Sequence, residues 1–96
     1  MPSKKLFKTG RQELSQAFLE MKTSKEMDKF LEDLLTPQEL ETLVERWLLI
    51  KLLLDGKTQR EVRDELGIGI ATVTRGSKQL KYGTGGFEMA VKRVGD

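Results

Sequence analysis

The sequence predicts an all-α fold, and three observations support this prediction. Apolar residues recur three and four positions apart in successive segments, which is the spacing of one face of a helix. Three segments contain Thr followed three residues later by Glu, a pattern in which each side chain pairs with the other residue's backbone N–H at a helix start. No segment shows the alternation expected of a strand. With 38% hydrophobic and 33% charged residues among 96, the chain has the composition of one globular domain.

The first two predicted helices cover residues 11–22 and 24–34. The second follows the segment TSKE, in which Thr23 and Glu26 have the spacing of a capping pair. Residues 1–10 carry a charge of +3 and precede the first apolar repeat. We expect them to form a frayed basic arm able to contact phosphates. Its charged residues are Lys4, Lys5 and Lys8.

A helix over residues 37–54 carries the most apolar segment of the chain. The segment TPQE starts it and places Pro37 at the first helical position, where a missing N–H costs nothing. From Trp47 onward the sequence WLLIKLLL is apolar nearly all round, so every side of this helix must be buried. One small chain buries a limited core, and we therefore predict a homodimer whose helices surround this segment. The alternative is the central helix of a monomeric bundle.

Two short helices, over residues 59–66 and 70–81, have the layout of a helix-turn-helix. Thr58 and Glu61 start the first helix, and Gly67 ends it in a turn where a positive φ favours glycine. Ile68 then fills the space between the helices, and Val73 anchors the second helix from inside.

The outward side of the helix over residues 70–81 suits an approach to the major groove of DNA. Small and hydroxylated residues lie near its start and basic residues lie further along, which favours entry with the N-terminus first. The outward positions are Ala71, Thr72, Thr74, Arg75, Lys78 and Lys81. A plain helical hairpin is the alternative, because the position after Val62 is usually small and here is Arg63.

Charge is unevenly distributed along the chain, although the net charge is only +2. Residues 11–56 sum to −4, residues 57–82 to +3 and residues 83–96 to zero. A local excess of basic residues is expected on a surface that binds nucleic acid. The six aromatic residues are not interleaved with the basic ones, which disfavours recognition of single-stranded RNA by stacking. Double-stranded DNA is therefore the expected partner.

Residues 1–96 are interpreted as a single domain with three parts. Residues 11–56 form a helical dimerisation core, residues 57–82 the helix-turn-helix, and residues 83–96 a C-terminal tail that can form a short helix near residues 86–94.

The composition disfavours an enzyme and a metal site. The chain has no cysteine and no histidine, which removes the thiolate ligand, the commonest metal ligand and the commonest general base. Ser77 and Lys81 lie four apart, but nothing on an exposed basic helix would activate the lysine. No apolar run has the length of a membrane span, and the start lacks the apolar stretch of a secretory signal. We expect a cytoplasmic protein with no metal and no membrane contact.

Gly76 raises a separate question, because it lies in the middle of the helix over residues 70–81. Glycine inside a helix costs on the order of 1 kcal/mol relative to alanine. The sequence therefore predicts that some group comes very close to the backbone at this position.

The segments LTPQE, QREV, ELG, GIAT and TRGS resemble the Trp repressor family, over about residues 31–82. The resemblance implies an intertwined all-helical homodimer with a helix-turn-helix. It also implies a repressor of transcription that binds L-tryptophan as a corepressor and, when loaded, an operator in double-stranded DNA. In this interpretation two guanidinium planes stack on the indole, and Gly76 lets the flat ring approach the backbone.

Site residues are carried over by motif from the same resemblance. The expected ligand-binding residues are Arg46 and Arg75 around the indole, Thr72 and Gly76 along the slot, and Leu35, Thr36 and Gln79 near the ammonium group. The residues expected at base edges are Arg60, Ile70, Ala71 and Thr74. Those expected near phosphates are Gln59, Arg63, Thr72, Ser77, Lys78 and Lys81.

Three departures from the enterobacterial repressors leave the effector open. Asp33 replaces a leucine near the ligand ammonium, and Gln79 replaces a serine that contacts the same group. The tail KYGTGGFEMAVKRV instead resembles a shorter branch of Trp repressor homologues. The alternative function is a dimeric DNA-binding regulator of the same fold that responds to another effector or to none. A third possible function is a protein-interaction module built on a helix-turn-helix. Its binding would depend only weakly on salt, which would distinguish it from a DNA-binding protein.

Overall fold

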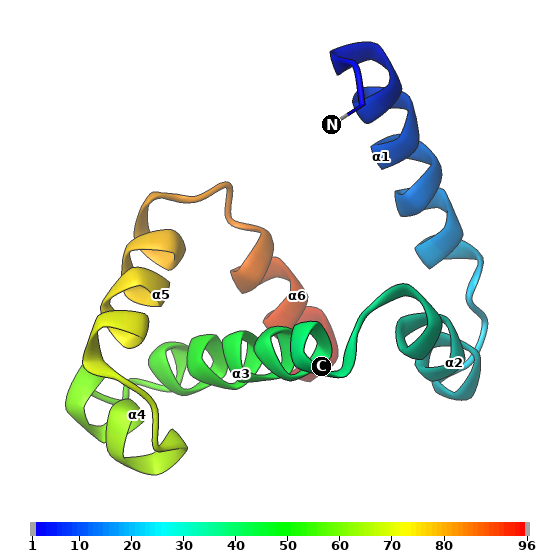
Figure 1. Ribbon diagram of the computed structural model, residues 1–96. Helices are drawn as coiled ribbons and strands as arrows, with labels where there is room; N and C mark the ends of the chain where they lie inside the picture. The colour runs from blue at the N-terminus through cyan, green and yellow to red at the C-terminus, as the bar shows by residue number, and fades with distance from the viewer. Residues whose placement is uncertain (1, 96) are drawn as a thin grey trace. The chain divides into compact units, whose positions relative to one another are not determined.

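The computed structural model describes residues 2–95, and all regular structure in this range is helical (Figure 1). The all-α prediction is therefore confirmed. The helices are α1 (Lys4–Glu20), α2 (Ser24–Leu34), α3 (Pro37–Leu54), α4 (Gln59–Leu66), α5 (Ile70–Tyr82) and α6 (Gly86–Gly95). The predicted bounds of α2, α3 and α4 agree with these residues, and the short helix expected in the tail is α6.

The predicted Thr and Glu pairs start three of the helices. At α3, the Glu39 N–H donates to the Thr36 hydroxyl over 3.1 Å, and the Thr36 N–H donates to the Glu39 carboxylate over 2.9 Å. Thr58 and Glu61 form the same reciprocal pair at α4. At α2 the Glu26 carboxylate instead accepts from the N–H of Lys22, one residue before the cap. Each arrangement satisfies backbone donors that a helix start leaves open.

The N-terminal residues correct one prediction. Instead of a frayed arm, the lysines at positions 4, 5 and 8 lie on α1, which begins at Lys4 and not near residue 11. The hydroxyl of Ser3 accepts from the Leu6 N–H over 3.2 Å and caps this helix. The start was missed because Ser3 lacks a Glu three residues later, and because Gly10 interrupts the apolar repeat.

The chain divides into two units, a first unit that ends at Leu40 and a second unit that begins at Glu41. In the first unit, α1 and α2 contain no fully buried residue. Their contact includes a ring pair, Phe18 and Phe30, with centroids 5.4 Å apart in an edge-to-face arrangement. Pairs of this geometry add a modest attraction beyond their buried area.

The second unit has a core of four fully buried side chains: Leu49, Ile50, Val62 and Val73. They come from α3, α4 and α5. The turn between α4 and α5 contains Gly67 in the left-handed region with φ 67°, as the sequence predicts. α6 packs on the same core through Phe87 and Val91.

The apolar segment of α3 is incompletely covered within one chain. Leu49 and Ile50 are buried, but the other large apolar residues of the helix are half-buried or exposed. The exposed ones are Leu43, Val44, Leu48 and Leu54, with exposures between 37% and 49%. Burial on every side, as predicted for a homodimer, is thus not reached by the described residues of a single chain. Within residues 2–95, no helix has both the length and the apolar character needed to cross a membrane.

Candidate functional site

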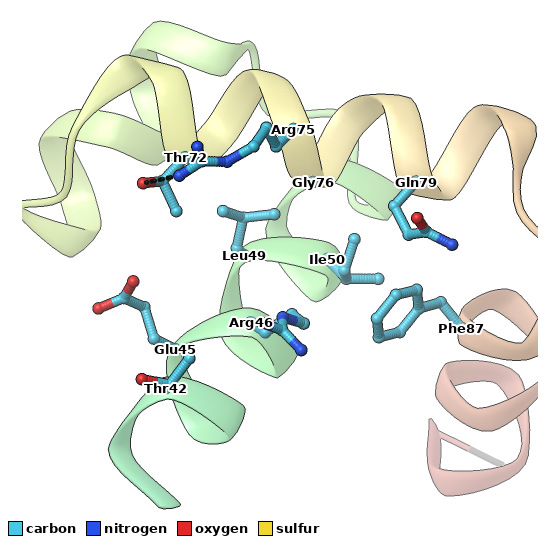
Figure 2. Close-up of a pocket in the computed structure, with 10 residues that line it drawn as sticks. All are labelled: Thr42, Glu45, Arg46, Leu49, Ile50, Thr72, Arg75, Gly76, Gln79 and Phe87. Carbon is cyan, nitrogen blue, oxygen red and sulfur yellow. Dashed lines mark hydrogen bonds between the residues drawn. The ribbon is translucent and has the colours of Figure 1, made fainter. Parts of the chain in front are cut away.

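A pocket of about 570 Å³ opens among α3, α5 and α6 of the second unit (Figure 2). Its volume falls within the range of small-molecule sites. The lining residues are Thr42, Glu45, Arg46, Leu49 and Ile50 of α3, Thr72, Arg75, Gly76 and Gln79 of α5, and Phe87 of α6.

Helical spacing explains why these residues share the pocket. The α3 residues lie three and four positions apart, and so do the α5 residues, so each set occupies one face of its helix. The helices are held in place from another side, because Val73 of α5 is fully buried in the core. Phe87 reaches the pocket because α6 follows the turn at Gly85, which has φ 85°, and packs back on α3.

The close approach predicted at Gly76 is made by Leu49. A Cβ atom added to Gly76 would overlap the Cδ2 atom of Leu49, and the Cδ1 atom would lie 3.4 Å away. The side chain of Leu49 extends from α3 toward α5 in Figure 2. Any side chain at position 76 would therefore force the side chain of Leu49 to move, even with no ligand present. The stacking of an indole against Gly76 stays a prediction.

The pocket combines charged groups with apolar surface. Arg46 and Arg75 supply two exposed guanidinium groups, and half-buried Glu45 supplies a carboxylate. The Arg75 guanidinium donates to the Thr72 hydroxyl over 3.4 Å, which orients it along α5. Leu49, Ile50 and Phe87 form the apolar part. Such a site can hold a small molecule that has an anionic group and an apolar body.

Five of the seven residues predicted to bind the ligand line this pocket. They are Arg46, Thr72, Arg75, Gly76 and Gln79. Leu35 and Thr36 belong to the first unit and are absent from the lining, as is Asp33. The side chain and N–H of Thr36 both bond to Glu39, and the Leu35 N–H donates to Leu31.

Five lining residues were missed by the sequence interpretation: Thr42, Glu45, Leu49, Ile50 and Phe87. Helical spacing from Arg46 could have identified the α3 residues, because all lie within one turn or so of it on one face. Phe87 carries no comparable signal, since its position depends on the turn between α5 and α6.

The residues predicted to contact DNA lie on α4 and α5 but differ in exposure. Arg60, Ile70, Ala71, Lys78 and Lys81 are exposed. Gln59, Arg63, Thr72, Thr74 and Ser77 are half-buried. The Thr74 hydroxyl donates to the Gln59 side-chain oxygen over 3.0 Å, so these two side chains also link α5 to α4.

Arg63 is engaged by a neighbouring carboxylate. Its Nε donates to Asp64 over 2.8 Å, and this hydrogen bond lowers the pKa of Asp64 below its ordinary value. The same bond raises the pKa of Arg63. The side chains of Arg63 and Asp64 are 39% and 68% exposed, so solvent screens the pair. A phosphate would have to compete with Asp64 for this guanidinium.

Charge on α5 is of one sign. The helix carries Arg75, Lys78 and Lys81 and has no acidic residue, whereas α4 carries three carboxylates. In residues 2–95, no group of three or more acidic residues is arranged to hold a metal ion.

Comparison with known protein families identifies a family for this chain. The model of the Trp repressor protein family matches residues 9–95 of this chain. This range includes α6 and most of α1, and is wider than the segment that carries the recognisable motifs.

Individual relatives agree with this match. The uncharacterised protein YerC of Bacillus subtilis is 35% identical over 85 residues, covering 85% of this chain and 82% of that protein. A Trp operon repressor homolog of Vibrio vulnificus is 48% identical over 58 residues, covering 59% of this chain but only 57% of that protein. Among solved structures, a TrpR-like protein from Eubacterium eligens is 31% identical, covers 95% of this chain and 94% of its own, and has a TM-score of 0.86.

Proposed function

This chain belongs to the Trp repressor family, and on that premise we propose that it is a sequence-specific DNA-binding repressor of transcription, gated by L-tryptophan and active as a homodimer. The observation that carries this proposal is the division of α5 into three faces. One face lines the pocket, a second packs into the core, and the third carries the exposed residues Ala71, Lys78 and Lys81 beside half-buried Thr74.

The three faces of α5 follow from the helical repeat of 3.6 residues. Thr72, Arg75, Gly76 and Gln79 form the pocket face. Val73 and Leu80 form the core face. Ala71, Thr74, Lys78 and Lys81 form the remaining face, which is positively charged. A ligand in the pocket would contact the same helix that contacts DNA.

This arrangement supports a simple mechanism for gating. A dimeric helix-turn-helix protein must present its two reading helices about one DNA turn apart, so a small tilt of α5 decides whether both fit. L-Tryptophan between α3 and α5 would favour one tilt. It shifts the population only by as much as it binds the DNA-competent arrangement more tightly than the other.

The homodimer is supported by apolar surface that one chain leaves uncovered. In the first unit Leu6, Phe7, Leu14 and Leu19 of α1 are exposed, as are the α3 residues described above. Isolated exposed apolar residues are ordinary, but a series of them on each of two helices supports the proposal that a second chain covers them.

Calorimetric titration tests the ligand. We expect saturable binding of L-tryptophan at one site per chain, weaker binding of L-phenylalanine, and loss of binding in Arg75→Ala, because this guanidinium meets the ligand carboxylate. The absence of heat at two temperatures would refute gating by tryptophan while leaving the DNA proposal standing.

A second experiment tests DNA binding independently of the ligand's identity. Duplexes selected from a random pool are measured by fluorescence anisotropy over a range of salt concentrations, with and without L-tryptophan. Each lost phosphate contact reduces the log–log slope by about 0.9. We expect that reduction in Lys78→Ala and in Lys81→Ala, and no change in Lys29→Ala, an exposed lysine of α2. Failure to select any duplex, or binding insensitive to salt, would refute the proposal.

A regulator with another effector, or with none, is the second candidate. Two observations favour it: Leu49 already fills the space against Gly76, and Phe87 already supplies an aromatic ring to the pocket. Selected duplexes bound equally well with and without L-tryptophan would support this candidate.

A further inference from the structure

We infer that Phe87 limits the size of the aromatic ligand that the pocket accepts, because its ring forms a wall between the pocket and a second cavity beside the turn from α5 to α6. The inference rests on the proposed ligand gating and adds a specificity-determining residue to it. Phe87 lies outside the motifs on which the family resemblance depends.

The second cavity has a volume of about 350 Å³. Its lining consists of Gln79 and Leu80 of α5, Thr84 and Gly85 of the turn, and Gly86 and Phe87 of α6. Gln79 and Phe87 also line the larger pocket, so these two side chains lie between the two cavities. Gln79 is exposed and Phe87 is half-buried. The ring of Phe87 is therefore the part of the wall that a ligand displaces least easily.

Packing holds the Phe87 ring in place. Phe87 packs against the buried core of the second unit, and Val91, four residues later on α6, packs against the same core. Residues four apart lie on one face of a helix, so α6 is held at two points on that face. In Figure 2 the ring extends from α6 toward Ile50 of α3. A ring packed in this way forms a rigid wall.

The proposed ligand meets Phe87 with the end that is far from its carboxylate. Arg75 is the residue expected to bind that carboxylate. In Figure 2 the ring of Phe87 lies beside Ile50, and the guanidinium of Arg75 points away from both. The aromatic side chain of the ligand then extends toward Phe87, because apolar groups gain most where they are removed from water. A longer side chain would collide with the ring, although the second cavity behind it has room.

A purely structural role is the competing explanation, in which Phe87 docks α6 on the core and does not affect the choice of ligand. Val91 provides the matched control. It packs on the same core from the same helix but is absent from the lining of both cavities. Val91→Ala therefore removes packing of α6 without opening the wall.

Two matched ligand pairs separate these explanations by calorimetry. L-Phenylalanine is compared with 4-phenyl-L-phenylalanine, and L-tryptophan with 5-phenyl-L-tryptophan, since each pair differs by one phenyl ring at the far end of the side chain. The titrations use the unaltered protein, Phe87→Ala, Phe87→Leu and Val91→Ala. Phe87→Leu keeps an apolar contact with the core, so it replaces the alanine variant if circular dichroism shows that the latter unfolds.

We expect the unaltered protein to bind the shorter member of each pair more tightly. Phe87→Ala should strengthen binding of the longer members by about tenfold or more, because their added ring becomes buried in the joined cavities. Phe87→Leu should shift the preference in the same direction by a smaller factor, and Val91→Ala should leave it unchanged. Equal binding of both members by the unaltered protein would overturn the inference. An unchanged preference in the Phe87 variants, or an equal change in Val91→Ala, would also overturn it.

A dye makes the test independent of tryptophan. Anilinonaphthalene sulfonate has an anionic group for the guanidinium groups and an aromatic body larger than indole. If the unaltered protein binds none of the four amino acids, gating by tryptophan fails, and the fluorescence of the dye then decides the inference. A stronger signal with Phe87→Ala than with the unaltered protein or Val91→Ala, abolished by adding Arg75→Ala, would support it. An equal signal in all three proteins, or an increase that survives Arg75→Ala, would overturn it.

Discussion

The first unit buries none of its helical side chains completely, whereas the second buries four across α3, α4 and α5. Both units have amphipathic helices and comparable capping, so local sequence does not explain the difference. The second unit gains its core because α4 and α5 fold back on α3 within the same chain. In the first unit, Phe18 and Phe30 form an aromatic pair, and the other large apolar residues are half-buried or exposed. Capping and helical spacing are thus enough to form the helices of both units. A buried core forms only where several helices of the chain pack together, as α3, α4 and α5 do.

The largest effect should come from removing a core side chain of the second unit. Ile50 is fully buried, so Ile50→Ala should lower the free energy of unfolding by about 2–5 kcal/mol through lost burial and a cavity. In the first unit, Lys29 of α2 is exposed, and Lys29→Ala should change it by less than about 0.5 kcal/mol. Urea unfolding monitored by circular dichroism measures both, and equal losses would contradict the comparison.

The next effect concerns the apolar side chains of the first unit. Phe7 is 55% exposed in the single chain and shares a helical face with Leu14 and Phe18. If a second chain covers this face, Phe7→Glu should weaken dimerisation by about tenfold or more, because a buried aromatic contributes roughly 2 kcal/mol. Thr9→Glu, with the same charge change on the opposite face of α1, is the control. Sedimentation equilibrium would contradict the prediction by giving one dissociation constant for both variants.

Gly10 and Gly76 each lie inside a helix, one in each unit, but they differ in what surrounds them. A Cβ on Gly10 of α1 would meet nothing within 4 Å, so Gly10→Ala should stabilise the protein by about 0.5–1 kcal/mol. A Cβ on Gly76 would overlap Leu49, so Gly76→Ala should destabilise it by about 1–3 kcal/mol. Opposite signs in urea unfolding are the expected result.

The cause of the Gly76 effect can be tested directly. In a Leu49→Ala background the overlapping atoms are absent, so adding Gly76→Ala should cost little or stabilise the protein. The same penalty in both backgrounds would show that Leu49 is not the cause. Gly76→Ala therefore alters helix packing by itself and is a poor test of ligand binding, for which Arg75→Ala is better suited.

The contrast also explains what could be predicted from the sequence. The bounds of α2, α3 and α4 follow from local features: Thr and Glu pairs, Pro37 and Gly67. The start of α1 was missed because its cap, Ser3, lacks the paired Glu. Each successful boundary depends on contacts within four residues along the chain.

The pocket depends on contacts between distant residues and was predicted only partly. Motifs on α5 together with Arg46 led to five lining residues, whose role in binding stays a prediction. The identity of the group against Gly76 could not be predicted, because glycine signals a close approach without indicating what approaches. Phe87 could not be placed, because its position depends on how α6 returns to α3.

The smallest expected effect concerns a helix cap of the second unit. Hydrogen bonds from Thr58 lower the pKa of Glu61 below its ordinary value, so the unfolded chain takes up this proton more readily than the folded one. The stabilisation from this carboxylate is therefore complete above the pKa of the unfolded chain, about 4.3, and is lost as the pH falls through the lower pKa of the folded chain.

Urea midpoints at about pH 6 and about pH 3 should differ less in Glu61→Gln than in the unaltered protein, because glutamine cannot be protonated in this range. The same pH dependence in both would mean that the carboxylate of Glu61 adds nothing to the stability of α4, and that the hydroxyl of Thr58 caps this helix alone.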